Sequence, residues 1–518
     1  MQGLRYCSVS RSELSAVAVA VGVLPLAAHL LTSTRYGYFR DEFYYIACSQ
    51  HLDWGYVDHP PLSIALLALE RWLLGDSLVA IRLLPALAGA GLVVLTVLLV
   101  RELGGGRCAQ VLAAVALLVA PYYVAVDNFY SMNAFEPLFW MAAAYTLIRL
   151  VNTGNAKLWL VFGLVAGLGL ENKHSLLFFG FAVALALLIT PQRQHLAGRW
   201  VWLGAAIAGL CFLPNIVWQV RHGWPTLEFM HNAQVYKIAA LSPPAFLAQQ
   251  VLMLHPLTLP LWMAGLAYYL VAPGARSYRF CGWVYVILLA LMLAERAKPY
   301  YLVPIYPLLL AGGAIVIETW TRQPRRQWLR PAYVIVLLIG GIVTAPLALP
   351  VLPAESVGWY ARWLHLDAGA KSSTAERAEL AELPQYFADM FGWDELVAAV
   401  ARAYDSLPPH DRARAAIYVG NYGEAGAINF LGKARQLPTA ISGHNNYWLW
   451  GPGNSSGDVV IVVGASREEL EPMFASVEEV GRVQCRYCMP FENQRPVYIC
   501  RALKRPLPEL WPQLKRYV

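Results

Sequence analysis

The run LVAIRLLPALAGAGLVVLTVLLV, residues 78–100, decides the fold class of this chain. It is almost wholly apolar and long enough to cross a bilayer as a helix, which takes roughly 17 to 25 residues. Similar runs recur through the first two thirds of the chain, separated by short charged loops. The predicted spans are 14–33, 78–100, 108–126, 134–150, 157–171, 175–190, 200–218, 248–271, 280–295, 299–318 and 332–351. The sequence therefore predicts an α-helical polytopic membrane protein with about 11–13 transmembrane helices.

Composition and charge agree with this class. Hydrophobic residues make up 58% of the 518 residues and charged residues 14%, against roughly 25% charged residues in a typical soluble domain. The formal net charge is +7, but the basic residues punctuate the apolar runs. They form no concentrated stripe with interleaved aromatic residues, which argues against nucleic-acid binding.

The loop charges predict the orientation of the chain. Cytoplasmic loops carry an excess of Arg and Lys. If the N-terminus is placed in the cytoplasm, the loops on the cytoplasmic side are the ones rich in basic residues, among them Arg101 and Arg325. We therefore expect a multi-pass protein of the bacterial inner membrane, with residues 352–518 outside the cytoplasm. Residues 61–75 include the charged Glu70 and fit an interfacial helix better than a span.

The chain divides by composition near residue 352. Residues 1–351 are predicted to form a transmembrane domain, and residues 352–518 a soluble extracytoplasmic α/β domain. The elements predicted in the second part are a helical stretch at 375–406, strands at 415–419, 458–463, 476–484 and 496–502, and a helix at 423–431. Ser466 and Glu469 form a capping box that opens a further helix.

Three cysteines cluster in the predicted extracytoplasmic domain: Cys485, Cys488 and Cys500. Disulfides are permitted in that compartment, so we expect a structural disulfide within this group. A zinc site would need a fourth ligand beyond these three thiols.

An Asp-Glu pair follows the first predicted span. Asp41 and Glu42 lie in a loop rich in aromatic and ionisable residues. A carboxylate here can act as a general base or bind a metal ion if it reaches the substrate; an ordinary solvated pair is the alternative. Farther along this loop, the D-H-P-P-L turn at 58–62 holds His59 in a defined direction because prolines restrict the backbone. His59 either contacts a phosphate oxygen or belongs to an interfacial turn.

Polar residues also gather between the third and fourth predicted spans. These are Asp127, Asn133 and Glu136. Such groups at a span boundary are costly unless they are hydrated or paired. They either face an aqueous active-site cavity or cap the fourth helix, because acids favour helix N-termini.

Two later turns carry basic and aromatic residues on the side predicted to hold the Asp-Glu pair. Lys173 lies in the turn E-N-K-H-S, and Lys298 is followed by Tyr300 and Tyr301. Cations stabilise developing phosphate charge, while a carboxylate takes the proton of the acceptor. This common sidedness predicts transfer from an anionic phosphate leaving group.

The order of these motifs resembles glycosyltransferase family 39, the group of the dolichyl-phosphate-mannose protein mannosyltransferases and the aminoarabinose transferases that act on lipid A. The resemblance covers roughly residues 14–350. It rests on the Asp-Glu pair, the H-P-P-L turn, S-M-N-A-F-E-P-L-F-W at the fourth span, and K-P-Y-Y-L-V-P-I-Y-P before a late span. It implies a GT-C membrane fold and an inverting transfer of a sugar from a polyprenyl or dolichyl phosphate donor.

The resemblance also implies roles for the acidic residues. Asp41 matches the first acidic motif of the family, which is expected to act as the base or to position the acceptor, with Glu42 beside it. Asn133 stands where related enzymes often have an acid. Glu136 and Asp127 are therefore further candidates for the second acidic position.

The donor phosphate is expected to contact basic and aromatic residues. His59 falls where the aminoarabinose transferases have Lys before Pro-Pro, and the motif from Lys298 to Tyr301 matches the basic-aromatic motif of the family. The residues expected at the donor phosphate are His59, Lys173, Lys298, Tyr300 and Tyr301. The tail at 352–518 resembles soluble domains attached to some bacterial members.

The sequence thus predicts an integral-membrane glycosyltransferase that works at the outer face of the membrane. Its expected partners are a polyprenyl-phosphate-sugar donor and a lipid, glycan or protein acceptor; the sugar and any divalent metal requirement stay open. A lipid-linked sugar flippase or transporter is the alternative, although transporters usually place polar groups near the bilayer midplane. A non-catalytic membrane scaffold would not explain why the polar groups share one side.

Overall fold

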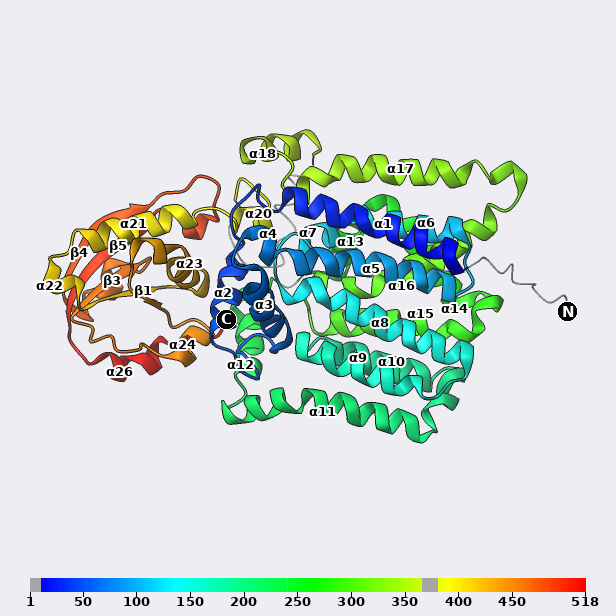
Figure 1. Cartoon of the computed structure of the whole chain (residues 1–518), viewed down its shortest axis with the longest axis horizontal. Helices are drawn as coiled ribbons and strands as arrows, with labels where there is room; N and C mark the ends of the chain where they lie inside the picture. Colours follow the sequence, from blue (N-terminus) through cyan, green and yellow to red (C-terminus); the bar gives the residue numbers. More distant parts are fainter. Residues whose placement is uncertain (1–10, 240, 366–380) are drawn as a thin grey trace.

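The computed structural model describes residues 11–239, 241–365 and 381–518, the side chains of 11–21 excepted. Figure 1 shows a long helical bundle and, beyond one end of it, a smaller domain built on a β-sheet. The first described helix begins at the opposite end of the bundle from that domain.

The helices of the bundle follow the predicted apolar stretches. Their bounds are α1 Arg11–Thr32, α4 Leu78–Ile81, α5 Leu83–Glu102, α6 Arg107–Leu118, α7 Pro121–Val126, α8 Met132–Thr153, α9 Leu158–Asn172, α10 Leu176–Leu188, α11 Arg199–Arg221, α13 Pro243–Met253, α14 Leu259–Val271, α15 Arg279–Ala294, α16 Tyr306–Trp320 and α17 Leu329–Thr344. In the described part of the chain, six helical segments are long and apolar enough to cross a membrane, or seven if one bent pair counts as a span, and four apolar helices are shorter. The predicted helical membrane fold is confirmed.

Two predicted spans are interrupted. The stretch 248–271 is not one helix, because α13 and α14 meet at 95°. The break falls at His255, which has a positive φ of 74°, and at Pro256, which lacks an N–H for the helical ladder. The stretch 108–126 likewise ends as α6 and resumes as α7 at Pro121.

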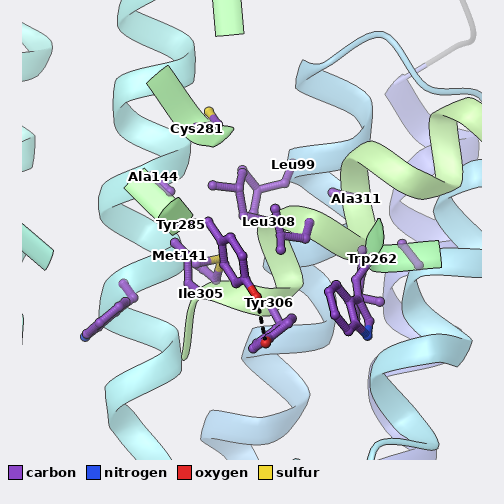
Figure 2. Close-up of a cluster of buried hydrophobic side chains, with 14 of the residues drawn as sticks. Leu99, Met141, Ala144, Trp262, Cys281, Tyr285, Ile305, Tyr306, Leu308 and Ala311 are labelled. Carbon is purple, nitrogen blue, oxygen red and sulfur yellow. Dashed lines mark hydrogen bonds between the residues drawn. The ribbon is translucent and has the colours of Figure 1, made fainter. Parts of the chain in front are cut away.

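The core of the bundle lies between α5, α8, α14, α15 and α16. Figure 2 shows Leu99, Met141, Trp262, Tyr285 and Tyr306 from these five helices packed together. The hydroxyls of Tyr285 and Tyr306 hydrogen-bond each other at 3.1 Å, which satisfies two polar groups inside this apolar region.

Close contact between α14 and α16 depends on glycine. A Cβ at Gly265 would collide with the backbone of α16 at Leu309, and one at Gly313 would collide with the backbone of α14 at Leu261. Small residues at such points let membrane helices approach to backbone contact, which increases their packing.

Short helices gather at the end of the bundle that faces the sheet domain. Figure 1 shows α2 and α3 there, with α12 beside them. Their bounds are α2 Arg40–Gln50, α3 Leu62–Leu74 and α12 Pro225–Asn232, and a 3-10 segment, η5, covers Pro299–Ile305. The helix α3 corresponds to the segment predicted at 61–75, and its Trp72 is 80% exposed.

The C-terminal part is an α/β domain around a five-stranded sheet. Its bounds are α18 Ala354–Trp363, α20 Gln385–Ala388, α21 Trp393–Asp405, β1 Ala415–Val419, α23 Tyr422–Leu431, β2 Ala440–Ile441, α24 Asn446–Trp450, β3 Val459–Val463, α25 Arg467–Leu470, β4 Phe474–Val483 and β5 Arg495–Leu503. The strand order is β2-β1-β3-β5-β4. The strand β1 runs parallel to β2 and β3, whereas β5 is antiparallel to β3 and β4.

The four predicted strands and the helix at 423–431 are confirmed within two residues at each end. The sequence missed β2, which has two residues and carries no periodicity of its own. The capping box of Ser466 and Glu469 is present at α25. Of the helical stretch predicted at 375–406, residues 366–380 lie outside the described residues, and the rest holds α20 and α21.

One hydrophobic core joins the two parts of the molecule. Phe43 and Ile46 of α2 belong to the same buried cluster as Leu396 of α21, Ile428 of α23 and Ile461 of β3. The C-terminal domain is therefore packed onto the loop that follows the first span. The compositional change near residue 352 does not separate two independent cores.

The disulfide expected in the C-terminal domain is present. It joins Cys485 to Cys488, while Cys500 on β5 is buried as a free thiol.

Candidate active site

Glu42, in the first turn of α2, is buried and fully hydrogen-bonded. Its side chain is fully buried and pairs with Arg82, whose Nε and Nη2 lie 2.9 and 2.8 Å from the two carboxylate oxygens. The same carboxylate accepts the N–H groups of Phe39 at 2.7 Å and Tyr130 at 2.9 Å. Four charge-assisted bonds satisfy this buried carboxylate. They tie the start of α2 to the α4–α5 junction and to the loop before α8.

Asp41, one residue earlier, has different surroundings. Its side chain is half-buried, and its Oδ1 accepts a hydrogen bond of 2.9 Å from the hydroxyl of Tyr422. Tyr422 is the first residue of α23, 381 residues farther along the chain. The C-terminal domain therefore contacts the carboxylate that the sequence predicts as the base.

His59 is buried among tyrosine rings. It stacks on Tyr45 at 4.9 Å between ring centroids, and Tyr44 and Tyr56 lie within 5.6 Å. Its Nδ1 is 3.1 Å from the carbonyl oxygen of Pro60, to which it donates, and its Nε2 has no hydrogen-bond partner among the described residues. The imidazole therefore keeps one nitrogen available for a ligand.

Asp58 lies beside this histidine. Its Oδ1 is 3.9 Å from His59 Nε2 and accepts a hydrogen bond of 2.9 Å from the Tyr44 hydroxyl. Burial raises the pKa of the Asp58 carboxyl above its ordinary value. Asn446 of α24 accepts the main-chain N–H of Val57 at 2.7 Å, a second contact from the C-terminal domain. We call Asp41, Tyr44, Asp58, His59 and Tyr422 the Asp41 cluster.

A second cluster forms where α8 begins. The Nζ of Lys173 lies 2.5 Å from Glu136 Oε2 and 2.7 Å from Asn133 Oδ1, and 4.9 and 5.3 Å from the ring centroids of Tyr301 and Tyr300. The ammonium is thus held by a carboxylate, an amide and two π faces. We call Asn133, Glu136, Lys173, Tyr300 and Tyr301 the Lys173 cluster.

The alternative that Asn133 and Glu136 cap the fourth span is wrong. Ser131 is the N-cap of α8, and its hydroxyl accepts the N–H of Asn133 at 3.2 Å. The second oxygen of Glu136 accepts a hydrogen bond from Ser175, just after Lys173. Glu136 therefore joins α8 to the turn between α9 and α10.

Lys298 lies close to the Lys173 cluster. Its side chain is buried, and its Nζ is 5.9 Å from the Tyr300 ring centroid. The ring of Tyr122 stacks on Tyr300 at 6.4 Å. Two ammonium groups, from Lys173 and Lys298, therefore lie within 6 Å of one tyrosine ring.

Tyr45 connects the two clusters. Its hydroxyl accepts the N–H of Met132 at 3.2 Å, one residue before Asn133, while its ring stacks on His59. The predicted residues of the first outer loop and those of the later turns consequently share one polar region at one end of the bundle.

Asp127 has different surroundings from Asn133 and Glu136. It follows α7, is buried, and lies so close to Gly89 of α5 that a Cβ at that glycine would collide with its carboxylate. It lines a cavity of about 200 Å³ between α1, α5, α7 and α17, together with His29. The sequence grouped Asp127 with Asn133 and Glu136; in the structure Asp127 lines this cavity, whereas Asn133 and Glu136 bind Lys173.

Two contacts of the site escaped the sequence prediction. Arg82 is the one charged residue in the run 78–100, and a charge inside a span needs a partner; this signal would have pointed to a nearby acid such as Glu42. Tyr422 carries no comparable signal, because nothing local connects it to residue 41. Among the described residues no group of three or more His, Cys, Asp or Glu side chains is placed to hold a metal ion.

Known proteins resemble this chain in sequence and in fold. Residues 58–218 match the family model described as dolichyl-phosphate-mannose-protein mannosyltransferase. The lipid A galacturonosyltransferase RgtD of Rhizobium johnstonii is 28% identical over 192 residues, which are 37% of this chain and 40% of that protein. The match thus spans two fifths of the relative, and the range that matches the family model includes His59, Asn133 and Lys173.

Solved structures resemble nearly the whole chain. ArnT from Cupriavidus metallidurans bound to undecaprenyl phosphate superposes with a TM-score of 0.62 at 15% identity, over 95% of this chain and 98% of ArnT. The mycobacterial arabinofuranosyltransferase AftD superposes with a TM-score of 0.53 at 15% identity, over 98% of this chain and 42% of AftD. The chain therefore shares its fold with these solved membrane glycosyltransferases, and its residues 58–218 match the family model.

Proposed function

We propose that this chain is an integral-membrane inverting glycosyltransferase. It moves a sugar from a polyprenyl-phosphate donor to a lipid, glycan or protein acceptor at the extracytoplasmic face. The observation that carries this proposal is the pair of ammonium groups, Lys173 and Lys298, around Tyr300, in a cluster that Tyr45 connects to His59 and the Asp41 cluster.

In the proposed reaction an acceptor hydroxyl attacks the anomeric carbon of the donor sugar. The new C–O bond forms as the bond from that carbon to the phosphate oxygen breaks, and the polyprenyl phosphate leaves with the electron pair. Asp41 takes the proton of the hydroxyl. The ammonium groups stabilise the charge that develops on the phosphate.

The contacts of Lys173 suit this role. An ammonium has three donors, and two of them bind Glu136 and Asn133. The third serves a phosphate oxygen. Asn133 is neutral where related enzymes often have an acid, so Lys173 shares its charge with one carboxylate rather than two. More positive charge is left for an anionic donor.

Glu42, by contrast, is assigned a structural role. Its two oxygens already accept four hydrogen bonds in a fully buried setting. Asp41 is half-buried and accepts its contact from a hydroxyl, so Asp41 is the better candidate for proton transfer. His59, with Nε2 unpartnered among the described residues, is assigned to the donor phosphate.

The relatives support a lipid-linked donor. ArnT was solved with undecaprenyl phosphate, and RgtD is named for the transfer of galacturonic acid to lipid A. The loop charges support a cytoplasmic N-terminus in a bacterial inner membrane. The transporter alternative is not favoured, because the polar clusters lie at one end of the bundle while the middle is packed with apolar side chains (Figure 2).

Donor consumption in membranes tests the proposal. Membranes that contain the wild-type protein are incubated with polyprenyl-phosphate mannose, aminoarabinose, galacturonic acid or arabinose, and each donor is followed by mass spectrometry. We expect loss of one donor with wild type and with Asp76→Asn, a matched change in the same loop. With Asp41→Asn we expect the rate to fall at least about 100-fold.

Each outcome bears on one part of the proposal. If the folded wild-type protein consumes none of these donors, the proposal that it transfers one of these four sugars from a polyprenyl phosphate is wrong. Lipid translocation then becomes the next measurement. If Asp41→Asn consumes donor as fast as wild type, the enzyme class stands and Asp41 is not the base.

A further inference from the structure

Tyr422 occupies a defined place at the boundary between the bundle and the C-terminal domain. Its ring lies between Tyr44, with centroids 4.5 Å apart, and His444, with centroids 4.7 Å apart, in a three-ring stack. The guanidinium of Arg40 lies 5.0 Å from the same ring. Tyr422 is 6% exposed, so its orientation is set on three sides by packing.

The hydroxyl of Tyr422 is a proton donor to Asp41. Burial, with the nearby Asp41 carboxylate, raises the pKa of this hydroxyl well above its ordinary value, so the hydroxyl keeps its proton. The 2.9 Å contact to Asp41 Oδ1 is therefore an O–H···O hydrogen bond to a carboxylate, one of the stronger kinds.

The backbone of Tyr422 is also held in place. Asn421 caps α23 and forms a capping box with Glu424. The main-chain N–H of Tyr422 donates to His444 Nδ1 at 3.2 Å, and His444 Nε2 donates to the carbonyl of Val518 at 2.9 Å. Burial lowers the pKa of His444 well below its ordinary value, which keeps this imidazole neutral as both contacts require.

Two glycines let α23 approach α2 closely enough for this contact. A Cβ at Gly423 would lie 2.6 Å from Arg40 Cγ, and a Cβ at Gly426 would lie 2.7 Å from Phe43 Cβ. The glycines are three residues apart and so face the same side of α23. They contact residues on either side of Asp41.

The C-terminal end of the chain fixes the domain at a second place. Lys515 pairs with Glu228 of α12 at 2.6 Å, and the carbonyl of Tyr517 accepts a hydrogen bond of 2.8 Å from Asn232. The domain is thereby attached to two separate outer segments of the bundle, which limits its rotation about α2.

We propose that Tyr422 is a positioning residue for sugar transfer, and that the C-terminal domain completes the active site by holding the Asp41 carboxylate through this hydroxyl. The inference rests on the proposed function, in which Asp41 is the base. It assigns a role to residues 352–518 that composition alone does not indicate. A half-buried carboxylate in the first turn of α2 would otherwise sample several rotamers, and fixed geometry at the reacting group lowers the barrier.

The test compares two Tyr→Phe variants of the full chain in membranes, with donor and acceptor kinetics. Tyr422→Phe keeps the stacked ring and removes the bond to Asp41. Tyr447→Phe removes a hydroxyl of similar burial that bonds Asn429 within the same domain. We expect kcat to fall about tenfold in Tyr422→Phe, with the donor KM within about twofold of wild type, and no change in Tyr447→Phe.

A double-mutant cycle separates positioning from folding. If Tyr422 acts through Asp41, adding Tyr422→Phe to Asp41→Glu should change kcat by less than about twofold, because the longer side chain has already lost the native contact. An equal loss in both backgrounds would overturn the inference. So would an unchanged kcat in Tyr422→Phe, a rise in donor KM alone, or an equal loss in Tyr447→Phe. Failure of the proposed function would appear differently, as inactivity of wild type itself.

Discussion

The two polar clusters of the site are assembled over very different distances along the chain. The Lys173 cluster joins the starts and ends of membrane helices, and the Glu136–Lys173 pair spans 37 residues. The Asp41 cluster joins an outer loop to a separate domain, and the Asp41–Tyr422 contact spans 381 residues. The first kind of contact follows from putting polar residues at the same end of neighbouring spans. The second kind of contact forms only when the folded C-terminal domain packs against one particular helix, α2.

The clusters also differ in what holds them. Lys173 is held by a buried ion pair and aromatic rings. Asp41 is held by one hydroxyl, whose own position depends on packing between α2 and α23. We therefore expect the geometry of the Asp41 cluster to be more sensitive than that of the Lys173 cluster to substitutions far from the reacting atoms.

Loss of charge at Glu42 should have the largest effect on stability. Glu42→Gln would leave Arg82 buried without its carboxylate, which costs about 3–5 kcal/mol for a buried pair. Glu228→Gln, at an exposed pair with Lys515, should cost about 0–1 kcal/mol. Thermal unfolding of both variants in one detergent measures the difference. Equal melting temperatures would show that the Glu42–Arg82 pair does not hold α2 in place.

The second-largest loss of stability should follow from a bulky residue at the contact between α2 and α23. Gly426→Val would place side-chain atoms against Phe43, and overpacking of this kind costs about 1–3 kcal/mol. Limited proteolysis should then release the C-terminal domain faster, and transfer should fall. Gly481→Val is the control, because a Cβ at that position meets nothing within 4 Å. Unchanged proteolysis in Gly426→Val would contradict close packing at this contact.

A smaller and more specific effect, on the KM for the donor, is expected from substitution of Lys298. Lys298→Ala should raise the donor KM about tenfold, because we propose that this charge binds the donor phosphate, and a tenfold change corresponds to about 1.4 kcal/mol. Steady-state kinetics with varied donor and varied acceptor separate the two substrates, and Lys298→Arg should retain most of the affinity. A change confined to the acceptor KM would assign Lys298 to the other substrate.

The last effect concerns the pH dependence of stability at α3. Burial raises the pKa of Glu70 to about 8, from an ordinary value of 4.5. Between these two values the folded state holds a proton that the unfolded chain releases, so stability falls as the pH rises from 4.5 to 8. Glu70→Gln mimics the protonated form and should flatten the melting temperature measured between pH 5 and pH 8. A slope equal to that of wild type would exclude Glu70 as its source.

Much of the site was predictable from sequence because its residues lie next to spans. Lys173, Lys298, Tyr300 and Tyr301 each sit in a turn at the end of an apolar run, and the side of the membrane follows from counting spans. The surroundings of Asp127 could not be predicted in this way. Asp127 lies in a short turn between α7 and α8, and the conformation of such a turn is not encoded in hydrophobic periodicity.

The sequence by itself determined that this chain is a helical membrane protein with a C-terminal α/β domain, because a bilayer-spanning helix must be a long apolar run whatever its neighbours are. It also determined that polar groups gather at one end, since charges avoid the bilayer interior. Only the tertiary structure decided that α13 and α14 form a bent pair, that Glu42 is buried on Arg82, and that Tyr422 reaches Asp41. Those outcomes depend on shape complementarity between surfaces far apart in the chain, and such complementarity leaves no periodic or local trace in the order of residues.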